Sequence, residues 1–307
     1  MKLTDEDCLT ETLAFNKQFE LAAAKRPTGP RDAATLAAAR RNRLAGDTPP
    51  VRLPQGRDRV VDGVPVRTFV PDRVNGVYLH IHGGGWAVGS ADGQDERLWQ
   101  LAEQTGLAVV SVEYRLAPEH PFPAGPDDCE AAALWLVARA QAEFGTDRLL
   151  IGGESAGAHL SVLTLLRLRD RHGITGAFRA AHLTFGPFDL SLTPSARLFG
   201  SRRLLSNTDS IRASAELCTP GLTPEQRRDP GISPLHADLT GLPPARISVG
   251  TEDPLLDDSL FLAARWQAAG APVDLCVVAG AMHGFTLFPL TVTERELRRQ
   301  HAYLAAA

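Results

Sequence analysis

The sequence predicts an α/β fold, in which helices cover both faces of a mostly parallel sheet. Short apolar runs alternate with helical stretches over most of the chain, which is the pattern of repeated βαβ units. The apolar runs are continuous, as is typical of parallel strands that are buried on both faces. The 307 residues are 44% hydrophobic and 22% charged, so the composition is that of a globular protein with a sizeable core.

The first fifty residues do not follow this pattern. Two alanine-rich amphipathic stretches, 5–25 and 32–45, are separated by the break Pro27–Pro30, and the second stretch ends at Gly46. We therefore predict a helical N-terminal segment over residues 1–50.

The alternating pattern begins near residue 57. The predicted strands are 77–81, 107–112, 149–153, 181–185, 246–249 and 273–278. The predicted helices are 94–105, 127–144, 156–171, 257–269 and 291–305. Residues 187–243 delay the next strand by more than one helix requires, so we predict that they form an insertion over the site. Residues 51–186 and 244–307 then form the catalytic domain.

Charge and cysteine usage exclude several classes of protein. The 32 Lys and Arg residues against 36 Asp and Glu leave no basic excess for binding nucleic acid. The four cysteines are far apart and contain no C-x-x-C pair, which indicates core residues in a reducing compartment. The N-terminus is acidic where a secretory leader would be basic, and no apolar run approaches the roughly 18 residues of a membrane span. We expect a cytoplasmic protein.

Residues Gly153–Gly157 match the pattern G-x-S-x-G, directly after an apolar strand and at the start of a helical stretch. The serine of such a turn has a strained backbone, and a Cβ atom at either flanking glycine would crowd neighbouring elements. An ordinary serine at a glycine-rich strand end is the alternative, which the order of strand, turn and helix disfavours. We predict that Ser155 is a nucleophile.

A serine hydroxyl needs an imidazole to take its proton and a carboxylate to orient that imidazole. Among the nine histidines, His283 follows the last predicted strand and precedes a glycine. Asp253 ends the strand before it; Asp257 and Asp258 are rivals that begin a helix, and Glu252 is a weaker candidate. The chain order of serine, aspartate and histidine is that of α/β-hydrolases.

Residues His82–Trp86 include three consecutive glycines after the strand 77–81. Such a turn lets backbone N–H groups point toward a tetrahedral oxyanion. A flexible hinge or a phosphate loop is the alternative, but neither phosphate-binding pattern is present. We predict an oxyanion hole formed by the N–H groups of Gly83, Gly84 and Ala156.

Glu154 stands next to the predicted nucleophile. Because adjacent residues at a strand end point to opposite sides, we expect Glu154 to face away from the serine. Tyr114 and Arg115 are its expected partners, in a supporting role.

Together with the segments Tyr114–Ala124, Asp253–Leu255 and His283–Phe285, these motifs resemble the bacterial hormone-sensitive lipase family (family IV) of carboxylesterases, within the α/β-hydrolase superfamily. The likeness runs from about residue 57 to the C-terminus. It implies an eight-stranded sheet, a helical cap built from residues 1–50 and the insertion, and ester hydrolysis without metal or cofactor. A homodimer through an exposed sheet edge is compatible with the resemblance, although no residue pattern indicates it.

The sequence departs from the family at three positions. Glu154 stands where the family usually has Asp, Ala158 where it usually has Gly, and Leu256 where it often has a charged residue. None of these positions is in the predicted triad.

We therefore expect a serine carboxylesterase that hydrolyses small esters with short to medium acyl groups through an acyl-enzyme. Two alternatives remain: an amide or acetyl hydrolase with the same triad, and a ligand-binding receptor that has lost the base, which the presence of His283 disfavours. The residues expected to line the substrate pocket are Trp86, Phe188, Phe199, Phe285, Phe15 and Phe19.

Overall fold

The computed structural model describes residues 3–24, 34–36, 40 and 51–307. The predicted helix 32–45 and the break before it therefore lie mostly outside the described residues. The strands are β1 (Leu3–Thr4), β2 (Arg57–Val61), β3 (Val64–Phe69), β4 (Gly76–Ile81), β5 (Leu107–Val112), β6 (Leu149–Glu154), β7 (Phe178–Thr184), β8 (Ala245–Glu252) and β9 (Val273–Met282). The longer helices are α1 (Leu9–Ala24), α3 (Asp95–Thr105), α4 (Ala124–Phe144), α5 (Ala156–His172), α6 (Pro194–Leu198), α7 (Thr208–Cys218), α8 (Leu256–Ala268) and α9 (Thr291–Ala306). Short 3₁₀ turns are η1 (Glu6–Cys8), η2 (Gln226–Arg228), η3 (Pro234–His236) and η4 (Phe285–Leu287).

One sheet of nine strands, counted over the described residues, runs through the molecule in the order β1-β9-β8-β7-β6-β4-β5-β3-β2. All neighbouring pairs are parallel except β2 with β3 and β3 with β5. The antiparallel hairpin of β2 and β3 turns at Asp62 and Gly63, which both have positive φ, as a tight Asp-Gly hairpin turn requires. The prediction of a mostly parallel α/β sheet is confirmed.

The expected number of eight strands is exceeded by β1. Leu3 and Thr4 pair in parallel with Val277 and Val278 of β9 at the edge of the sheet. β1 was not predicted because its two residues are too few to show the alternation of apolar and polar side chains that marks a strand. The sequence of the N-terminal segment therefore predicted only helix.

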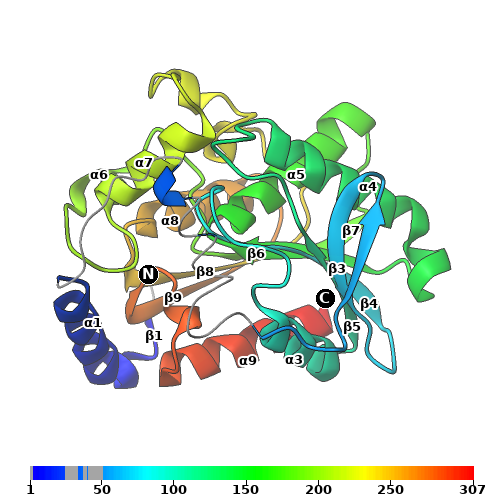
Figure 1. Cartoon of the computed structure of the whole chain (residues 1–307), viewed down its shortest axis with the longest axis horizontal. Coiled ribbons are helices and arrows are strands. Elements are labelled where there is room, and N and C mark those ends of the chain that lie inside the picture. The colour runs from blue at the N-terminus through cyan, green and yellow to red at the C-terminus, as the bar shows by residue number, and fades with distance from the viewer. Residues whose placement is uncertain (1–2, 25–33, 37–39, 41–50) are drawn as a thin grey trace.

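Two helical layers enclose the sheet (Figure 1). Helices α4, α5 and α8 lie on one face, where their apolar residues form one large core with the strands. Helices α3 and α9 lie on the other face and share a second apolar cluster with β4, β5 and β6. The central strands β4 and β5 are buried along their whole length, which explains their continuous apolar sequence.

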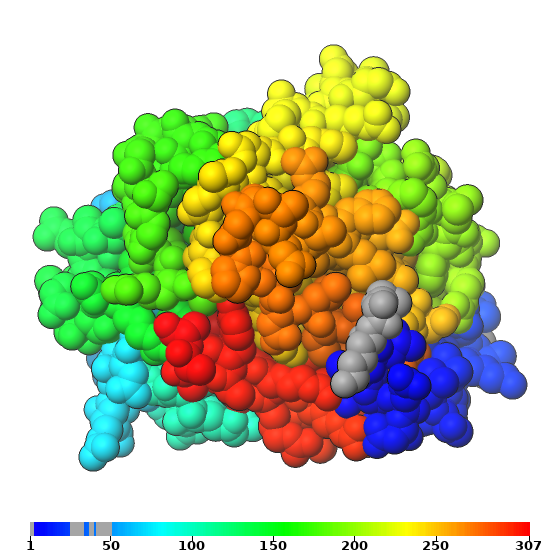
Figure 2. All heavy atoms as spheres, turned by 180° about the vertical axis from the view of Figure 1, so that it is seen from behind, coloured from blue at the N-terminus to red at the C-terminus, as the bar shows by residue number. Residues whose placement is uncertain are grey.

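The N-terminal residues pack against the part of α9 that carries Arg295 and Arg299, whereas the C-terminus lies elsewhere on the molecule (Figure 1). Figure 2 shows the N-terminal residues, in blue, against the red C-terminal helix α9. Within the described residues, no helix combines the length and the apolar character that a membrane span needs.

Candidate active site

Ser155 occupies the sharp turn between β6 and α5. Its backbone has φ 53° and ψ −121°, a conformation that non-glycine residues adopt only where the surrounding structure enforces it. A Cβ atom at Gly153 or Gly157 would lie 2.0 or 1.8 Å from the carbonyl oxygen of Ile81, so only glycine fits on either side. The turn therefore lifts the serine side chain clear of the sheet.

Three strand ends bring the predicted triad residues together. Ser155 Oγ lies 3.0 Å from His283 Nε2, and His283 Nδ1 lies 2.9 and 3.1 Å from the two carboxylate oxygens of Asp253. Because the carboxylate accepts the Nδ1 proton, Nε2 is left unprotonated and can accept a proton from the serine hydroxyl. Asp253 is 2% exposed, so water does not compete for the imidazole.

A bulge in β9 sets the position of His283. Gly250 of β8 is opposite Val278, whereas Glu252 is opposite Met282, so β9 has two more residues than β8 over this span. Gly280 lies in the bulge with φ 71°. The extra residues bend the end of β9 and direct His283 toward Asp253.

The rival carboxylates have other partners. Asp258 Oδ1 accepts hydrogen bonds from the N–H groups of Phe188 and Asp189, at 2.7 and 2.9 Å. Burial raises the pKa of Asp258 to about 7. Asp257 accepts the N–H of Ser195 at 2.8 Å. Both residues thus hold the beginning of the 187–243 segment and do not contact His283.

The glycine turn after β4 packs against Ser155. A Cβ atom at Gly83 would lie 3.4 Å from Ser155 Cβ and 2.7 Å from the carbonyl oxygen of Glu154. Gly84 has φ 123°, and a Cβ atom there would lie 2.1 Å from the carbonyl oxygen of Val88. Ala156 is the first residue of α5, so its N–H has no acceptor within the helix. The three predicted N–H donors therefore belong to residues beside Ser155.

His82 and Tyr114 hold this turn in place. The Tyr114 hydroxyl donates to the carbonyl oxygen of His82 at 2.9 Å, and the two rings stack with centroids 4.2 Å apart.

Glu154 faces away from Ser155, as expected, but its partners differ from the expected ones. It accepts a hydrogen bond from Gln94 and lies 3.1 Å from His80 Nε2. These partners belong to the α3 side of the sheet. Tyr114 instead bonds to the glycine turn, and Arg115 pairs with Asp128 of α4 on the opposite face.

The environment of Glu154 predicts a pH-dependent contribution to stability. Burial alone would raise its pKa, but the adjacent His80 ring and the hydrogen bonds from His80 and Gln94 outweigh this effect and lower the pKa from 4.5 to about 2. A carboxyl group with a depressed pKa stabilises the fold above its unfolded-state pKa, and this contribution is lost as the pH falls toward 2. The shift corresponds to roughly 3 kcal/mol.

We therefore expect Glu154→Gln to lower the free energy of unfolding at pH 7, and the difference from wild type to shrink between about pH 4.5 and 2. Urea unfolding at a series of pH values measures both quantities. Glu103→Gln, which changes an exposed glutamate on α3, is the matched control. A difference that stays constant over this pH range would contradict the assignment.

A cavity of about 940 Å³ opens beside Ser155 and His283. Its volume is at the upper end of the range for small-molecule sites. The apolar part of its wall includes Trp86, Phe185, Leu205, Ile211, Leu255 and Leu287. Among these, Leu205 and Ile211 belong to the 187–243 segment, which therefore forms part of the wall.

Of the six aromatic residues predicted to line the pocket, the structure places Trp86 in the wall. Its indole Nε1 donates to His159 Nδ1 at 3.1 Å, and His159 Nε2 in turn donates to the carbonyl oxygen of Ile232 at 2.7 Å. Burial lowers the pKa of His159 to about 4, so it remains a neutral acceptor. The orientation of Trp86 is thereby fixed from the 187–243 segment.

The other five aromatic residues lie outside the cavity wall, which corrects the prediction. Phe188 and Phe285 are fully buried in the core. Phe199 is half-buried, with the Arg202 guanidinium 5.5 Å from its ring centroid.

Phe15 and Phe19 of α1 also have a different role. Their rings pack on Phe288, with centroids 5.0 and 5.5 Å away. Composition shows that these side chains are apolar but not in which direction they point, and this direction is set by the packing of α1 on β9.

Phe185 was not singled out from the sequence, although it contacts the triad. Its ring packs edge to face against His283, with centroids 4.8 Å apart, and it lines the cavity. Its role could have been inferred from its position as the last residue of the predicted strand 181–185, at the edge of the sheet where Ser155, Asp253 and His283 also lie.

Among the described residues, no cluster of three or more His, Cys, Asp or Glu side chains could hold a metal ion.

The known proteins that this chain resembles agree with one another in fold and in kind of activity. A profile of the alpha/beta hydrolase fold matches residues 78–287. The chain is 37% identical over 276 residues to the carboxylesterase NlhH of Mycobacterium tuberculosis, covering 85% of each protein. It is 33% identical over 231 residues to the ethyl acetate hydrolase of Pseudomonas putida, covering 72% of this chain and 71% of the relative. The crystal structure of a hormone-sensitive lipase from a metagenome library superposes with a TM-score of 0.84 at 30% identity, over 96% of this chain and 97% of the other.

Proposed function

Since the chain belongs to the α/β-hydrolase family of carboxylic ester hydrolases, we propose that Ser155 is its nucleophile and that its substrates are small esters with short to medium acyl groups. In this proposal His283 is the general base and acid, and Asp253 orients it. The N–H groups of Gly83, Gly84 and Ala156 form the oxyanion hole.

Hydrolysis then proceeds in two acyl transfers. Ser155 Oγ attacks the ester carbonyl carbon while His283 Nε2 takes the hydroxyl proton, and the carbonyl oxygen becomes an oxyanion held by the three N–H groups. The C–O bond to the alcohol breaks, and His283 returns the proton to the leaving alkoxide. Water, deprotonated by His283, attacks the acyl-enzyme; the acid leaves and Ser155 regains its proton.

The observation that carries this proposal is the continuous hydrogen-bond chain from Ser155 Oγ through His283 to the buried carboxylate of Asp253. This chain contains the three groups of a serine hydrolase in the required order, with the imidazole tautomer already set.

The lining of the cavity supports the presence of a cap. Residues of α7 and of the loop before it line the cavity, so we propose that the 187–243 segment acts as a cap. The similarity to an ethyl acetate hydrolase is consistent with short acyl groups. A cytoplasmic location, also part of the proposal, agrees with the four buried cysteines, which are all free thiols.

A series of p-nitrophenyl esters tests the substrate class. With acetyl, butyryl, octanoyl and palmitoyl esters, we expect kcat/KM to be highest among the shorter acyl groups and to fall steeply at palmitoyl, in line with the similarity to an ethyl acetate hydrolase. A matched p-nitroanilide distinguishes an amide hydrolase from an ester hydrolase. Preference for the palmitoyl ester, or for the anilide over the ester, would overturn the proposed substrate class.

A further inference from the structure

The N-terminal residues pack on the part of the chain that carries His283. Residues 3–24, which we call the N-terminal clasp, comprise β1, η1 and α1. The clasp lies at the edge of the sheet beside β9, and α9 follows His283 on the same side (Figure 1). Its contacts reach both sides of this histidine in the sequence.

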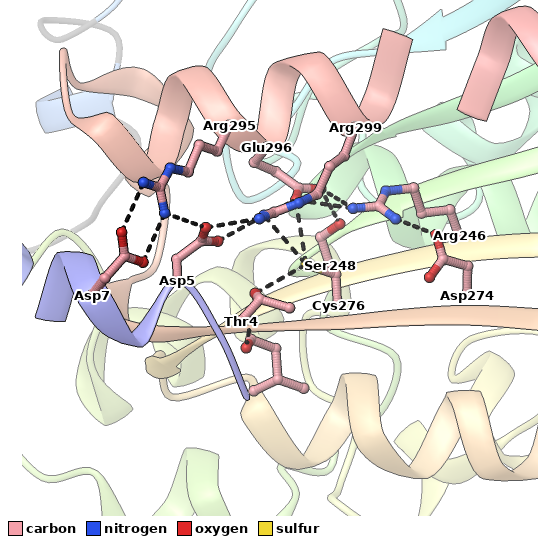
Figure 3. Close-up of polar contacts among 11 residues, drawn as sticks. Thr4, Asp5, Asp7, Arg246, Ser248, Asp274, Cys276, Arg295, Glu296 and Arg299 are labelled. Carbon is pink, nitrogen blue, oxygen red and sulfur yellow. Dashed lines mark hydrogen bonds and ion pairs between the residues drawn. The ribbon is translucent and has the colours of Figure 1, made fainter. Parts of the chain in front are cut away.

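An ion-pair cluster anchors the beginning of the clasp to α9 (Figure 3). Arg299 donates to both carboxylate oxygens of Asp5 at 2.7 Å. Arg295 lies 3.1 Å from Asp5 and 2.8 Å from Asp7. The side chain of Asp5 is 2% exposed and that of Arg299 is 33% exposed, so the carboxylate of this bidentate pair is buried while the guanidinium still reaches solvent.

The α9 side of the anchor is itself fixed to the sheet. Glu296 is buried and lies 3.0 Å from Arg246 of β8 and 3.5 Å from Arg299 (Figure 3). The first residues of the clasp are therefore tied through α9 to the strand that leads to Asp253.

On the N-terminal side of His283 in the sequence, the clasp contacts the bulge of β9. The side-chain amide of Asn16 donates to the carbonyl oxygen of Gly280 at 2.8 Å, and Asn16 is 2% exposed. The N–H of Gly280 donates to Thr251 Oγ1 at 2.8 Å. A Cβ atom at Gly280 would lie 2.8 Å from Leu9 of α1, so the helix is seated directly on the bulge.

After His283, the same helix holds the outgoing loop. Phe15 and Phe19 pack on Phe288, and Glu11 accepts the N–H of Thr291 at 3.3 Å. The loop from Gly280 to Thr291 is thus held from α1 at both ends.

The clasp makes these contacts without reaching the substrate. No described residue of α1 belongs to the wall of the cavity beside Ser155. An effect of α1 on turnover must therefore pass through the elements that it contacts: the backbone that carries His283 and, by way of the Glu20–Arg202 ion pair, the 187–243 segment.

We propose that the N-terminal clasp positions His283 for proton transfer, and that Asn16 is its central positioning residue. This inference rests on the proposed function, in which His283 is the base. Without the amide of Asn16, the carbonyl of Gly280 would be left buried and unpaired, and the bulge would relax to find another donor. Only two residues, Ala281 and Met282, stand between Gly280 and His283, and a displacement of the imidazole by about 1 Å can cost a factor of about 100 in rate.

Asn16→Leu tests the proposal, because leucine keeps the branching and the number of heavy atoms of the side chain and removes its donor. We expect kcat to fall by about 10- to 100-fold with KM unchanged. Gln18→Leu is the matched control, since it removes an amide from an exposed position of the same helix and should leave both constants at the wild-type values.

Titration with a fluorophosphonate separates positioning from unfolding. If Asn16→Leu positions His283 poorly, all Ser155 residues still react, but more slowly; if the variant is partly unfolded, the number of reactive serines falls instead and the proposal is contradicted. Should Asn16→Leu not fold at all, Phe19→Leu tests the other contact, with a smaller fall in kcat expected. If the folded variant keeps the wild-type kcat, the clasp does not position His283, and the proposed triad is unaffected. If Ser155→Ala is active, the proposed function itself is wrong.

Discussion

Ser155→Ala should lower kcat by roughly a million-fold, because the three triad residues act as one unit and the remaining rate comes only from binding and oxyanion stabilisation. The substitution removes a single oxygen, the atom 3.0 Å from His283 Nε2. Hydrolysis of p-nitrophenyl butyrate per mole of folded protein measures the loss. KM should change little, since the cavity wall is otherwise intact.

Ser161→Ala is a matched control for this experiment. Ser161 is buried on the same helix, α5, and its hydroxyl donates to the carbonyl oxygen of Gly157 at 2.7 Å. Removing a hydroxyl that only bonds back to its own helix should leave turnover near the wild-type value. If Ser155→Ala retained a tenth of the wild-type rate, Ser155 could not be the nucleophile.

Gly84→Ala should lower kcat by about 100- to 1,000-fold, which is the usual cost of losing one oxyanion-hole donor. The new Cβ would lie 2.1 Å from the carbonyl oxygen of Val88, so the turn must shift and its N–H groups must move away from the carbonyl oxygen of the substrate. Because the ground-state ester gains little from these donors, KM should change less than kcat.

Alanine at position 84 would also be strained by the positive φ of this position. Gly63→Ala measures the effect of such backbone strain without a steric clash. Gly63 has φ 84° in the hairpin of β2 and β3, and a Cβ atom there would meet nothing within 4 Å. We expect this variant to lose some stability but to keep its turnover. Equal losses of kcat in the two variants would show that backbone strain, and not the oxyanion hole, accounts for the effect at Gly84.

The fold and the triad could be predicted because their signals are local. The strands around Ser155 and His283 are continuous apolar runs, and the motif residues follow them directly. The ends of parallel strands meet at one edge of a sheet, so the sequence order of strand and motif was sufficient to bring Ser155, Asp253 and His283 together.

The pocket and the N-terminal contacts could not be predicted in the same way. Phe15 and Phe188 are equally apolar, yet one packs on the loop after His283 and the other in the core, because tertiary packing decides the direction of each ring. The partners of Glu154 depend on which face of the sheet its side chain reaches. The buried position of Asn16 could not be predicted from the sequence. It is one of several polar residues in α1, and the sequence does not distinguish it from those on the surface.

The position of β1 also bears on how copies of this protein could assemble. The backbone groups of β9 at Val277 and Val278 already pair with Leu3 and Thr4, so a strand from a second copy could bond there only by displacing β1. Such a displacement would release the N-terminal clasp from the loop that carries His283. By the inference above, a homodimer that extends the sheet by displacing β1 would be built from subunits with lower turnover.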